Sequence, residues 1–304
     1  MPELPEVETV RRTLDQLIVG KTIGKVTVKL ARIVQKPAEP EQFAAALEGR
    51  RVLSVERRGK FLRIVLDGLV LVSHLRMEGR YGVYGREEPT ESHTHVVFHF
   101  TDGMELRYKD VRQFGTMHLF ATGEEWTSAP LNKLGLEPLD EAFTSDAFRR
   151  ALGQRKTMIK PLLLNQEIVV GLGNIYVDEA LHDAGIHPET PANELKRKQL
   201  DRLHASIVKT LALAVEAGGS TIRTYVNSHG EAGMFQHRLK VYARAGEPCD
   251  DCGTPIEKSV VGGRGTHVCP KCQQLQGKGR KATPSSPAKQ RSTAVKRRLD
   301  GTGH

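Results

Sequence analysis

The 304-residue sequence contains no run of 18 apolar residues and no pattern typical of a secretory signal peptide. We therefore expect a cytoplasmic protein with no membrane partner. Cysteine is also scarce, with four residues in the whole chain. Because intracellular chains rarely keep disulfides, an intracellular location disfavours disulfides between these cysteines. No internal repeat is evident.

Acidic residues are in deficit, with 36 Asp and Glu against 45 Lys and Arg, and the net charge is +9. This balance favours a polyanionic partner. Residues 277–304 hold eight Lys or Arg and one acid, so they carry +7 and only +2 remains for residues 1–276. This tail is rich in Gly, Ser and Pro, and we expect it to be disordered. It either adds salt-sensitive affinity for nucleic acid or has no role, and the sequence leaves both open.

Short β-type runs bounded by turn residues fill the first part of the chain after an N-terminal helical segment. We predict strands over Ile23–Leu30, Val52–Glu56, Phe61–Leu66, Leu69–Ser73, His95–Phe100, Met104–Tyr108 and Thr116–Phe120. Asp67-Gly68 and Asp102-Gly103 are typical of hairpin turns. Because no helices alternate with these strands, the pattern favours a β-sandwich over a parallel sheet.

Apolar residues recur at helical spacing between residues 145 and 217, and the longest such stretch is Asn193–Ala217. The expected fold class is thus a multidomain α+β chain. We predict four parts: an N-terminal sandwich domain at 1–130, a helical domain at 131–236, a cysteine module at 237–276 and the tail at 277–304. A cleft is expected between the first two parts.

The four cysteines form two pairs, Cys249-x2-Cys252 and Cys269-x2-Cys272. Two such pairs predict a tetrahedral site for one structural zinc ion, with no position left open for catalysis. The segment between the pairs is typical of a β-hairpin whose glycine-rich tip presents Arg264. A zinc ribbon alone supports no more than nucleic-acid binding.

The first residues, Met1-Pro2-Glu3, carry a candidate reagent. If Met1 is removed, the ring nitrogen of Pro2 becomes a free secondary amine, and an α-amine has an ordinary pKa of about 8, against about 10.4 for lysine. Attack of this amine on a sugar C1′ yields a cationic iminium, and Glu3 lies where it can move protons. Val7, Val10 and Leu14 recur at helical spacing, so a packed helix is expected to hold the N-terminus in place.

The string M-P-E-L-P-E-V-E-T-V-R-R closely resembles the start of the bacterial formamidopyrimidine-DNA glycosylases, of the formamidopyrimidine glycosylase–endonuclease VIII family. These enzymes excise oxidised purines such as 8-oxoguanine and nick the strand. The resemblance recurs in motifs as far as residue 276. It implies that Pro2 is the nucleophile, that Glu3 and Lys60 transfer protons, and that Arg264 contacts the lesion phosphates and assists the second elimination.

The resemblance also implies residues that replace the extruded base. Met77, in H-L-R-M-E-G, and Arg112 and Phe114, in D-V-R-Q-F-G, match the family's three void-filling side chains. Extruding a base costs a few kcal/mol, and apolar plugs with an arginine on the orphaned partner base would offset that cost.

Further DNA-binding residues follow from the same matches: His74, His93, Arg155, Lys160 and Asn174. Gly171-Leu172-Gly173 precedes a helix, and we expect its N–H groups to face a phosphate. The element G-L-G-N-I-Y resembles the family's helix–two-turn–helix. In the family, the loop matching Gly218–Phe235 closes over 8-oxoguanine, and we expect a mobile lid there.

We therefore predict a monomeric, bifunctional glycosylase and abasic-site lyase that acts on damaged double-stranded DNA in bacterial base excision repair, associated with the nucleoid. Two alternatives stay open. One is an enzyme of the endonuclease VIII type, which prefers oxidised pyrimidines. The other is a non-catalytic zinc-ribbon protein that binds DNA.

Overall fold

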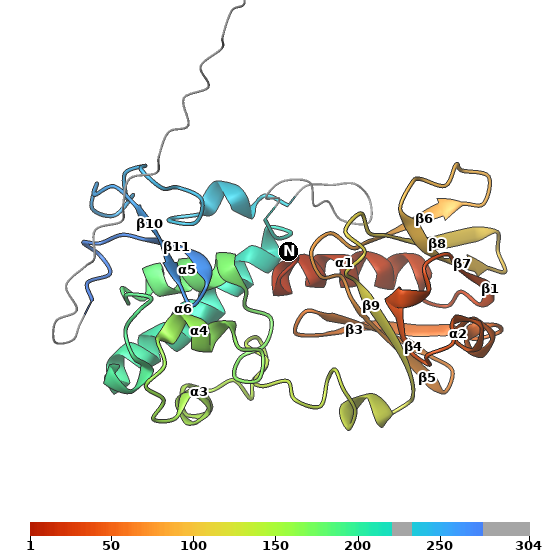
Figure 1. The fold of residues 1–304 in the computed structure, drawn as a ribbon, viewed down its shortest axis with the longest axis horizontal. Helices are drawn as coiled ribbons and strands as arrows, with labels where there is room; N and C mark the ends of the chain where they lie inside the picture. Colours follow the sequence, from red (N-terminus) through yellow and green to blue (C-terminus); the bar gives the residue numbers. More distant parts are fainter. Residues whose placement is uncertain (221–232, 276–304) are drawn as a thin grey trace, which may run out of the picture.

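The computed structural model describes residues 1–220 and 233–275. The basic tail at 277–304 lies outside this range, as does most of the expected lesion-covering loop. Among the described residues, two lobes flank the N-terminal helix α1 (Leu4–Ile18), and the N-terminus lies at their junction (Figure 1).

The first lobe is a β-sandwich of two sheets, as the absence of alternating helices predicted. One sheet has the order β1-β7-β8-β6 and the other β2-β9-β5-β4-β3. All pairs are antiparallel except β2 with β9. The strands are β1 (Ile23–Val28), β2 (Val34–Lys36), β3 (Val52–Arg58), β4 (Phe61–Leu66), β5 (Leu69–His74), β6 (Arg80–Gly85), β7 (Thr94–Phe100), β8 (Met104–Lys109) and β9 (Thr116–Ala121).

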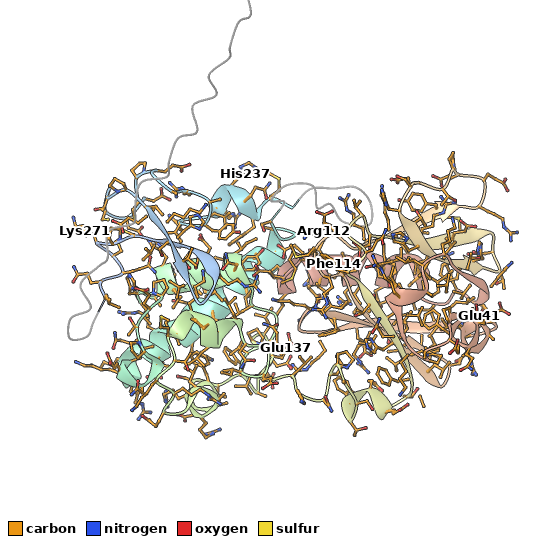
Figure 2. The ribbon with its side chains drawn as sticks, in the orientation of Figure 1. Glu41, Arg112, Phe114, Glu137, His237 and Lys271 are labelled. Carbon is orange, nitrogen blue, oxygen red and sulfur yellow. The ribbon has the colours of Figure 1, made fainter. Side chains whose placement is uncertain are left out.

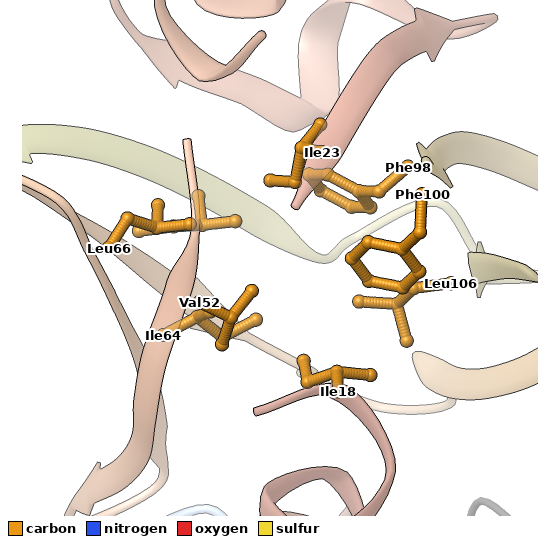
Figure 3. A pocket seen from close by; sticks show the side chains of 9 residues that line it. Ile18, Ile23, Val52, Ile64, Leu66, Phe98, Phe100 and Leu106 are labelled. Atoms are coloured by element: carbon orange, nitrogen blue, oxygen red, sulfur yellow. The ribbon is translucent and has the colours of Figure 1, made fainter. Parts of the chain in front are cut away.

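Apolar side chains of both sheets and of α1 point toward one another in the interior of this lobe, as Ile18, Ile64 and Phe98 do in Figure 3. Since α1 packs here with Val7, Val10 and Leu14 fully or almost fully buried, the predicted anchoring of the N-terminal segment is confirmed.

Seven of the nine strands were predicted to within two residues at either end, and both Asp-Gly turns occur, with Gly68 and Gly103 at positive φ. The sequence analysis missed β2, β6 and the helix α2 (Pro40–Leu47). The strand β2 has three residues and β6 contains two glycines, so neither has the run of β-branched residues that marks a strand.

The second lobe is helical, with α3 (Ser145–Leu152), α4 (Ile159–Leu164), α5 (Asn174–Asp183) and α6 (Arg197–Glu216). Short 3-10 turns lie at Ala31–Ile33, Glu124–Trp126, Ala192–Glu194 and Phe235–Arg238. The predicted long helix begins four residues later than expected because Ala192–Glu194 forms such a turn. An antiparallel hairpin of β10 (Glu257–Val261) and β11 (Arg264–Val268) packs against α5.

No helix of residues 1–220 and 233–275 has both the length and the apolar character that crossing a membrane requires.

Candidate functional site

The N-terminal residues lie where the two lobes meet. The Leu4 N–H donates to the Gly171 carbonyl oxygen at 3.0 Å, and the Leu4 side chain packs into the core of the helical lobe. From Val7 onward, α1 packs into the sandwich. Pro2 is buried between them. The fold therefore holds the predicted nucleophile at the boundary of two separate cores.

Glu3 occupies the N-terminus of α5. Its carboxylate accepts hydrogen bonds from the backbone N–H groups of Gly173 at 2.7 Å and Ile175 at 2.9 Å. The expectation that the glycine-flanked turn before this helix binds a phosphate is wrong for its two glycine N–H groups, because that of Gly173 donates to Glu3 and that of Gly171 donates to the Gln166 side-chain oxygen at 2.9 Å. A Cβ on Gly173 would lie 2.4 Å from the Glu3 carboxyl carbon, so only glycine permits the approach.

The surroundings of Glu3 tune its acidity. Burial raises the pKa of Glu3 to about 7, although the charge of Lys60 and the N–H groups of α5 act to lower it. Such a carboxyl is part protonated at neutral pH and can both give and take a proton. Burial also lowers the pKa of Lys60, and nearby Arg264 acts in the same direction. The structure thus places Glu3, Lys60 and Arg264 close enough to affect one another electrostatically.

Glu6 is a residue of this site that was not among the predicted site residues. It is 3% exposed, and its carboxylate accepts from the Glu3 N–H at 2.8 Å, the Tyr176 hydroxyl at 2.6 Å and the Ser220 N–H at 2.7 Å. Glu6 therefore ties the N-terminal segment to α5 and to Ser220, at the base of the expected lesion-covering loop. An acid three residues after the residue that precedes a helix is a capping-box signal, which could have identified the first of these bonds.

Lys60 lies in the two-residue turn between β3 and β4. The Glu137 carboxylate, from the chain leading into the helical lobe, accepts from the Gly59 N–H at 2.8 Å and from Arg57 and Arg58 at 2.6 and 3.0 Å. Figure 2 shows Glu137 at the junction of the lobes. Glu137 therefore fixes the turn that carries Lys60. Nothing local in the sequence marked Glu137, because its partners are almost 80 residues away.

Arg112 and Phe114 lie on an exposed turn, on the side of the sandwich that faces the helical lobe (Figure 2). Phe114 is 52% exposed, and the Arg112 guanidinium lies 5.0 Å from its ring centre. The turn is built on Asp110, which is fully buried and accepts from the Arg112 N–H at 3.1 Å and the Gly115 N–H at 2.8 Å. Met77 follows β5 and is 36% exposed. Met77 and Phe114 are thus exposed apolar side chains on turns, which suits them to insertion into DNA rather than to packing in a core.

Of the predicted DNA contacts His74, His93 and Arg155, the first is buried and the other two are exposed. His74 is buried against Phe61, and burial lowers its pKa to about 3. Its Nδ1 accepts from the Arg76 N–H at 2.8 Å, so the neutral ring carries its proton on Nε2 and can donate there. His93 and Arg155 are exposed, and His93 has a positive φ of 62°.

Lys160 and Asn174 bind protein groups in this structure. Lys160 is fully buried, and its ammonium donates to Asp178 at 2.6 Å and to the Gly265 carbonyl oxygen at 3.0 Å. The Asn174 amide donates to the same carbonyl oxygen at 2.8 Å. This placement differs from the expected contact with DNA, because a buried ammonium cannot reach DNA without leaving its partners. Direct DNA contact by either residue stays a prediction.

The four cysteine sulfurs lie within 4.8 Å of one another. The sulfurs of Cys249 and Cys272 are 3.9 Å apart, and those of Cys252 and Cys269 are 3.5 Å apart. A tetrahedral ion with thiolates at about 2.3 Å requires separations of about 3.8 Å, so the residues fit one structural zinc ion. His182, from α5, approaches the Cys249 sulfur with Nε2 at 3.5 Å.

Comparison with known proteins agrees with this geometry. Three family models match: the formamidopyrimidine-DNA glycosylase N-terminal domain at residues 1–117, the H2TH domain of the same enzymes at 134–226, and a zinc finger found in FPG and IleRS at 246–275. These matches lie inside the predicted parts 1–130, 131–236 and 237–276, whose boundaries stay predictions.

Relatives and solved structures cover most of the chain. The formamidopyrimidine-DNA glycosylase of Brevibacillus brevis is 62% identical over 91% of this chain and its own full length. That of Bacillus subtilis is 58% identical over 90% of this chain and 99% of its own. The Lactococcus lactis Fpg, solved with DNA containing an abasic site, is 44% identical with a TM-score of 0.84, over 90% of this chain and 99% of its own. The chain therefore belongs to the formamidopyrimidine-DNA glycosylase family.

Proposed function

We propose that the protein is a DNA glycosylase and abasic-site lyase that removes oxidised purines during base excision repair. The observation that carries the proposal is the placement of Glu3, whose carboxyl has a pKa of about 7 and lies one residue from Pro2 at the junction of two lobes. A non-catalytic zinc-ribbon protein would have no need for a buried, half-protonated acid beside its N-terminus.

The first chemical step requires removal of Met1. The Pro2 nitrogen then donates its lone pair to C1′ of the damaged nucleotide, and the bond from C1′ to the base breaks. Glu3 supplies a proton to balance the departing charge. The Glu3 carboxylate then takes the N–H proton from the Pro2 nitrogen and passes it to the sugar ring oxygen, so the bond from C1′ to that oxygen breaks and the Pro2 nitrogen and C1′ form an iminium.

The iminium acidifies the hydrogen on C2′, so the 3′ phosphate leaves by β-elimination. The 5′ phosphate then leaves by δ-elimination. Lys60 can move a proton in these steps because burial lowers its pKa. Arg264 is a cation suited to the phosphates. The product is a one-nucleotide gap with phosphate at both ends.

DNA binding is proposed for the remaining residues. Met77, Arg112 and Phe114 fill the space left by the extruded base, and His74, His93, Arg155 and Asn174 are the proposed contacts to the strand. The sequence also predicts a strand contact for Lys160, but its ammonium is buried against Asp178, so we do not propose that contact. We place the protein as a monomer in the bacterial cytoplasm, at the nucleoid. The zinc ion, when bound, supplies structure rather than chemistry, because the cysteines occupy all four of its positions.

The test is strand cleavage of a duplex that contains 8-oxoguanine. We expect base release and a gap with phosphate at both ends, and we expect Glu3→Gln to abolish base release. Base release that is unchanged in Glu3→Gln would contradict the assigned proton transfer. Absence of cleavage of either the 8-oxoguanine or an abasic duplex would contradict the proposed function.

Preference for oxidised pyrimidines is the second candidate. A solved structure of the Lactococcus lactis Fpg, 43% identical to this chain, holds DNA containing an oxidised pyrimidine. Competition between 8-oxoguanine and thymine-glycol duplexes separates the two candidates. We expect the purine duplex to be cleaved faster, and the reverse order would favour the alternative.

A further inference from the structure

The β10–β11 hairpin presents Arg264 without holding its side chain. Arg264 is exposed, and no hydrogen bond to its guanidinium occurs among the residues that the structure describes. The position of this cation is therefore set by its backbone alone.

That backbone is held by a chain of hydrogen bonds that starts at Lys160. The Lys160 ammonium donates to the Thr266 hydroxyl at 2.9 Å, and this hydroxyl donates to the Arg264 carbonyl oxygen at 2.9 Å. The next carbonyl oxygen, of Gly265, accepts from Lys160 itself at 3.0 Å.

Asp178 on α5 completes the arrangement. One of its carboxylate oxygens accepts from Lys160 at 2.6 Å, and the other accepts from the His267 N–H at 2.9 Å. Lys160 and Asp178 both have fully buried side chains. A buried ion pair of this kind gains little net stability, because desolvation offsets the attraction, but it strongly favours one geometry. Both ends of the Arg264–His267 segment are thus fixed to the helical lobe.

The tip of the hairpin is also closely packed. Gly262 has a φ of +56°, and a Cβ there would lie 2.7 Å from the ring of Pro161, the neighbour of Lys160. The tip of the hairpin therefore packs directly against α4. The same helix α5 holds Glu3 at its N-terminus and Asp178 one turn later, so the acid and the hairpin share one rigid support.

We propose that Lys160, Asp178 and Thr266 are positioning residues that place Arg264 against the DNA, and that Lys160 acts through Arg264 rather than by touching DNA. The inference rests on the proposed function, because it assumes that Arg264 acts on a bound lesion strand.

The test is a double-mutant cycle between Thr266→Val and Arg264→Ala. Thr266→Val keeps the side-chain shape and leaves Lys160 paired with Asp178. It therefore removes the hydroxyl link to the Arg264 carbonyl oxygen without leaving an unpaired buried charge. The readouts are the single-turnover rate on an 8-oxoguanine duplex and the affinity for a duplex with a tetrahydrofuran abasic analogue. Thermal unfolding and zinc content show whether each variant folds.

We expect Thr266→Val to slow the reaction about tenfold in the otherwise unchanged protein, the cost of one misplaced catalytic group. In the Arg264→Ala background the same change should alter the rate less than about twofold, since the group it positions is absent. Lys160→Met should follow the same pattern with a larger loss of stability. Thr27→Val removes a hydroxyl that pairs with His99 on β7, far from the hairpin in the chain, and serves as the control with no expected effect.

An equal loss of rate in both backgrounds would overturn the proposal, because Thr266 would then act independently of Arg264. No loss in the unchanged background would also overturn it. If the protein cleaved no duplex at all, the proposed function would fail, and the affinity cycle would still show whether Thr266 and Arg264 are coupled.

Discussion

Glu3 and Glu6 are two buried acids one helical turn apart, and they have different roles because their neighbours differ. Glu3 faces Lys60 and the N-terminus of α5, where burial brings its pKa to about 7. Glu6 faces a tyrosine hydroxyl and two N–H groups, which hold it as a structural acceptor. At this scale the sequence predicted the cluster of four cysteines, which the structure confirms, whereas the catalytic roles of Pro2 and Glu3 stay predictions. It could not predict Glu6 or Asp178, since their roles depend on partners from distant elements.

The pKa of Glu3 predicts how stability depends on pH. The folded protein holds this proton more tightly than the unfolded chain, with a pKa of about 7 against 4.5, so Glu3 stabilises the fold most below pH 4.5 and less as the pH rises through 7. That difference is worth about 3 kcal/mol. The glutamine of Glu3→Gln does not titrate. We therefore expect the free energy of unfolding of this variant to rise relative to that of the native protein as the pH rises from 5 to 8.

Urea denaturation over this pH range measures the effect. Glu8→Gln, on the same helix, is the control: the arginine partners of Glu8 lower its pKa, so its contribution is lost only at lower pH and should stay constant from pH 5 to 8. A pH-independent difference for Glu3→Gln would contradict the assigned pKa.

Short turns, rather than the long elements, carry the proposed DNA-reading residues. Lys60 and Met77 are positioned by the hairpin strands β4 and β5, which were predicted from the sequence pattern and an Asp-Gly turn. The sequence analysis identified the D-V-R-Q-F-G motif of the Asp110 turn, but not how Asp110 holds the turn together. The hydrogen bonds that the buried Asp110 carboxylate accepts appear only when β7 and β8 are paired.

Asp110→Asn should loosen the turn that carries Arg112 and Phe114. An amide nitrogen cannot accept from the N–H of Arg112 or Gly115, and an unsatisfied buried donor costs about 1–3 kcal/mol. We expect affinity for a duplex with an abasic analogue to fall, while affinity for undamaged DNA is unchanged. Fluorescence anisotropy with both duplexes measures this. Asp102→Asn, which alters the acceptor of the Met104 N–H at another hairpin, should leave both affinities unchanged, and a matching loss there would refute the account.

At the scale of the whole molecule, the proposed catalytic groups come from the junction of the lobes, from the sandwich and from the β10–β11 hairpin. Pro2 and Glu3 lie at the start of α1, Lys60 on the sandwich and Arg264 on the hairpin. The order of the parts was predicted from the sequence, but their joining was not. It depends on Glu137, Glu6 and Asp178, whose partners lie between about 80 and 210 residues away.

Glu137→Gln tests this joining. It weakens the acceptor shared by Arg57, Arg58 and the Gly59 N–H, and breaking a largely buried ion pair costs about 3 kcal/mol. Thermal unfolding should show the loss, and the rate on an abasic duplex should fall because the Lys60 turn is released. Glu124→Gln, at an exposed pair with Lys36, is the matched control and should change neither. Equal effects of the two variants would show that Glu137 has no special role between the lobes.

The central claim is that a secondary amine at Pro2, freed by removal of Met1, forms the bond to the damaged strand. Borohydride reduction during the reaction with an 8-oxoguanine duplex, followed by peptide mapping, measures this directly. The account predicts one covalent protein–DNA adduct, located on the nitrogen of Pro2 in a chain that lacks Met1. An adduct on a lysine, or full cleavage by a chain that retains Met1, would contradict it.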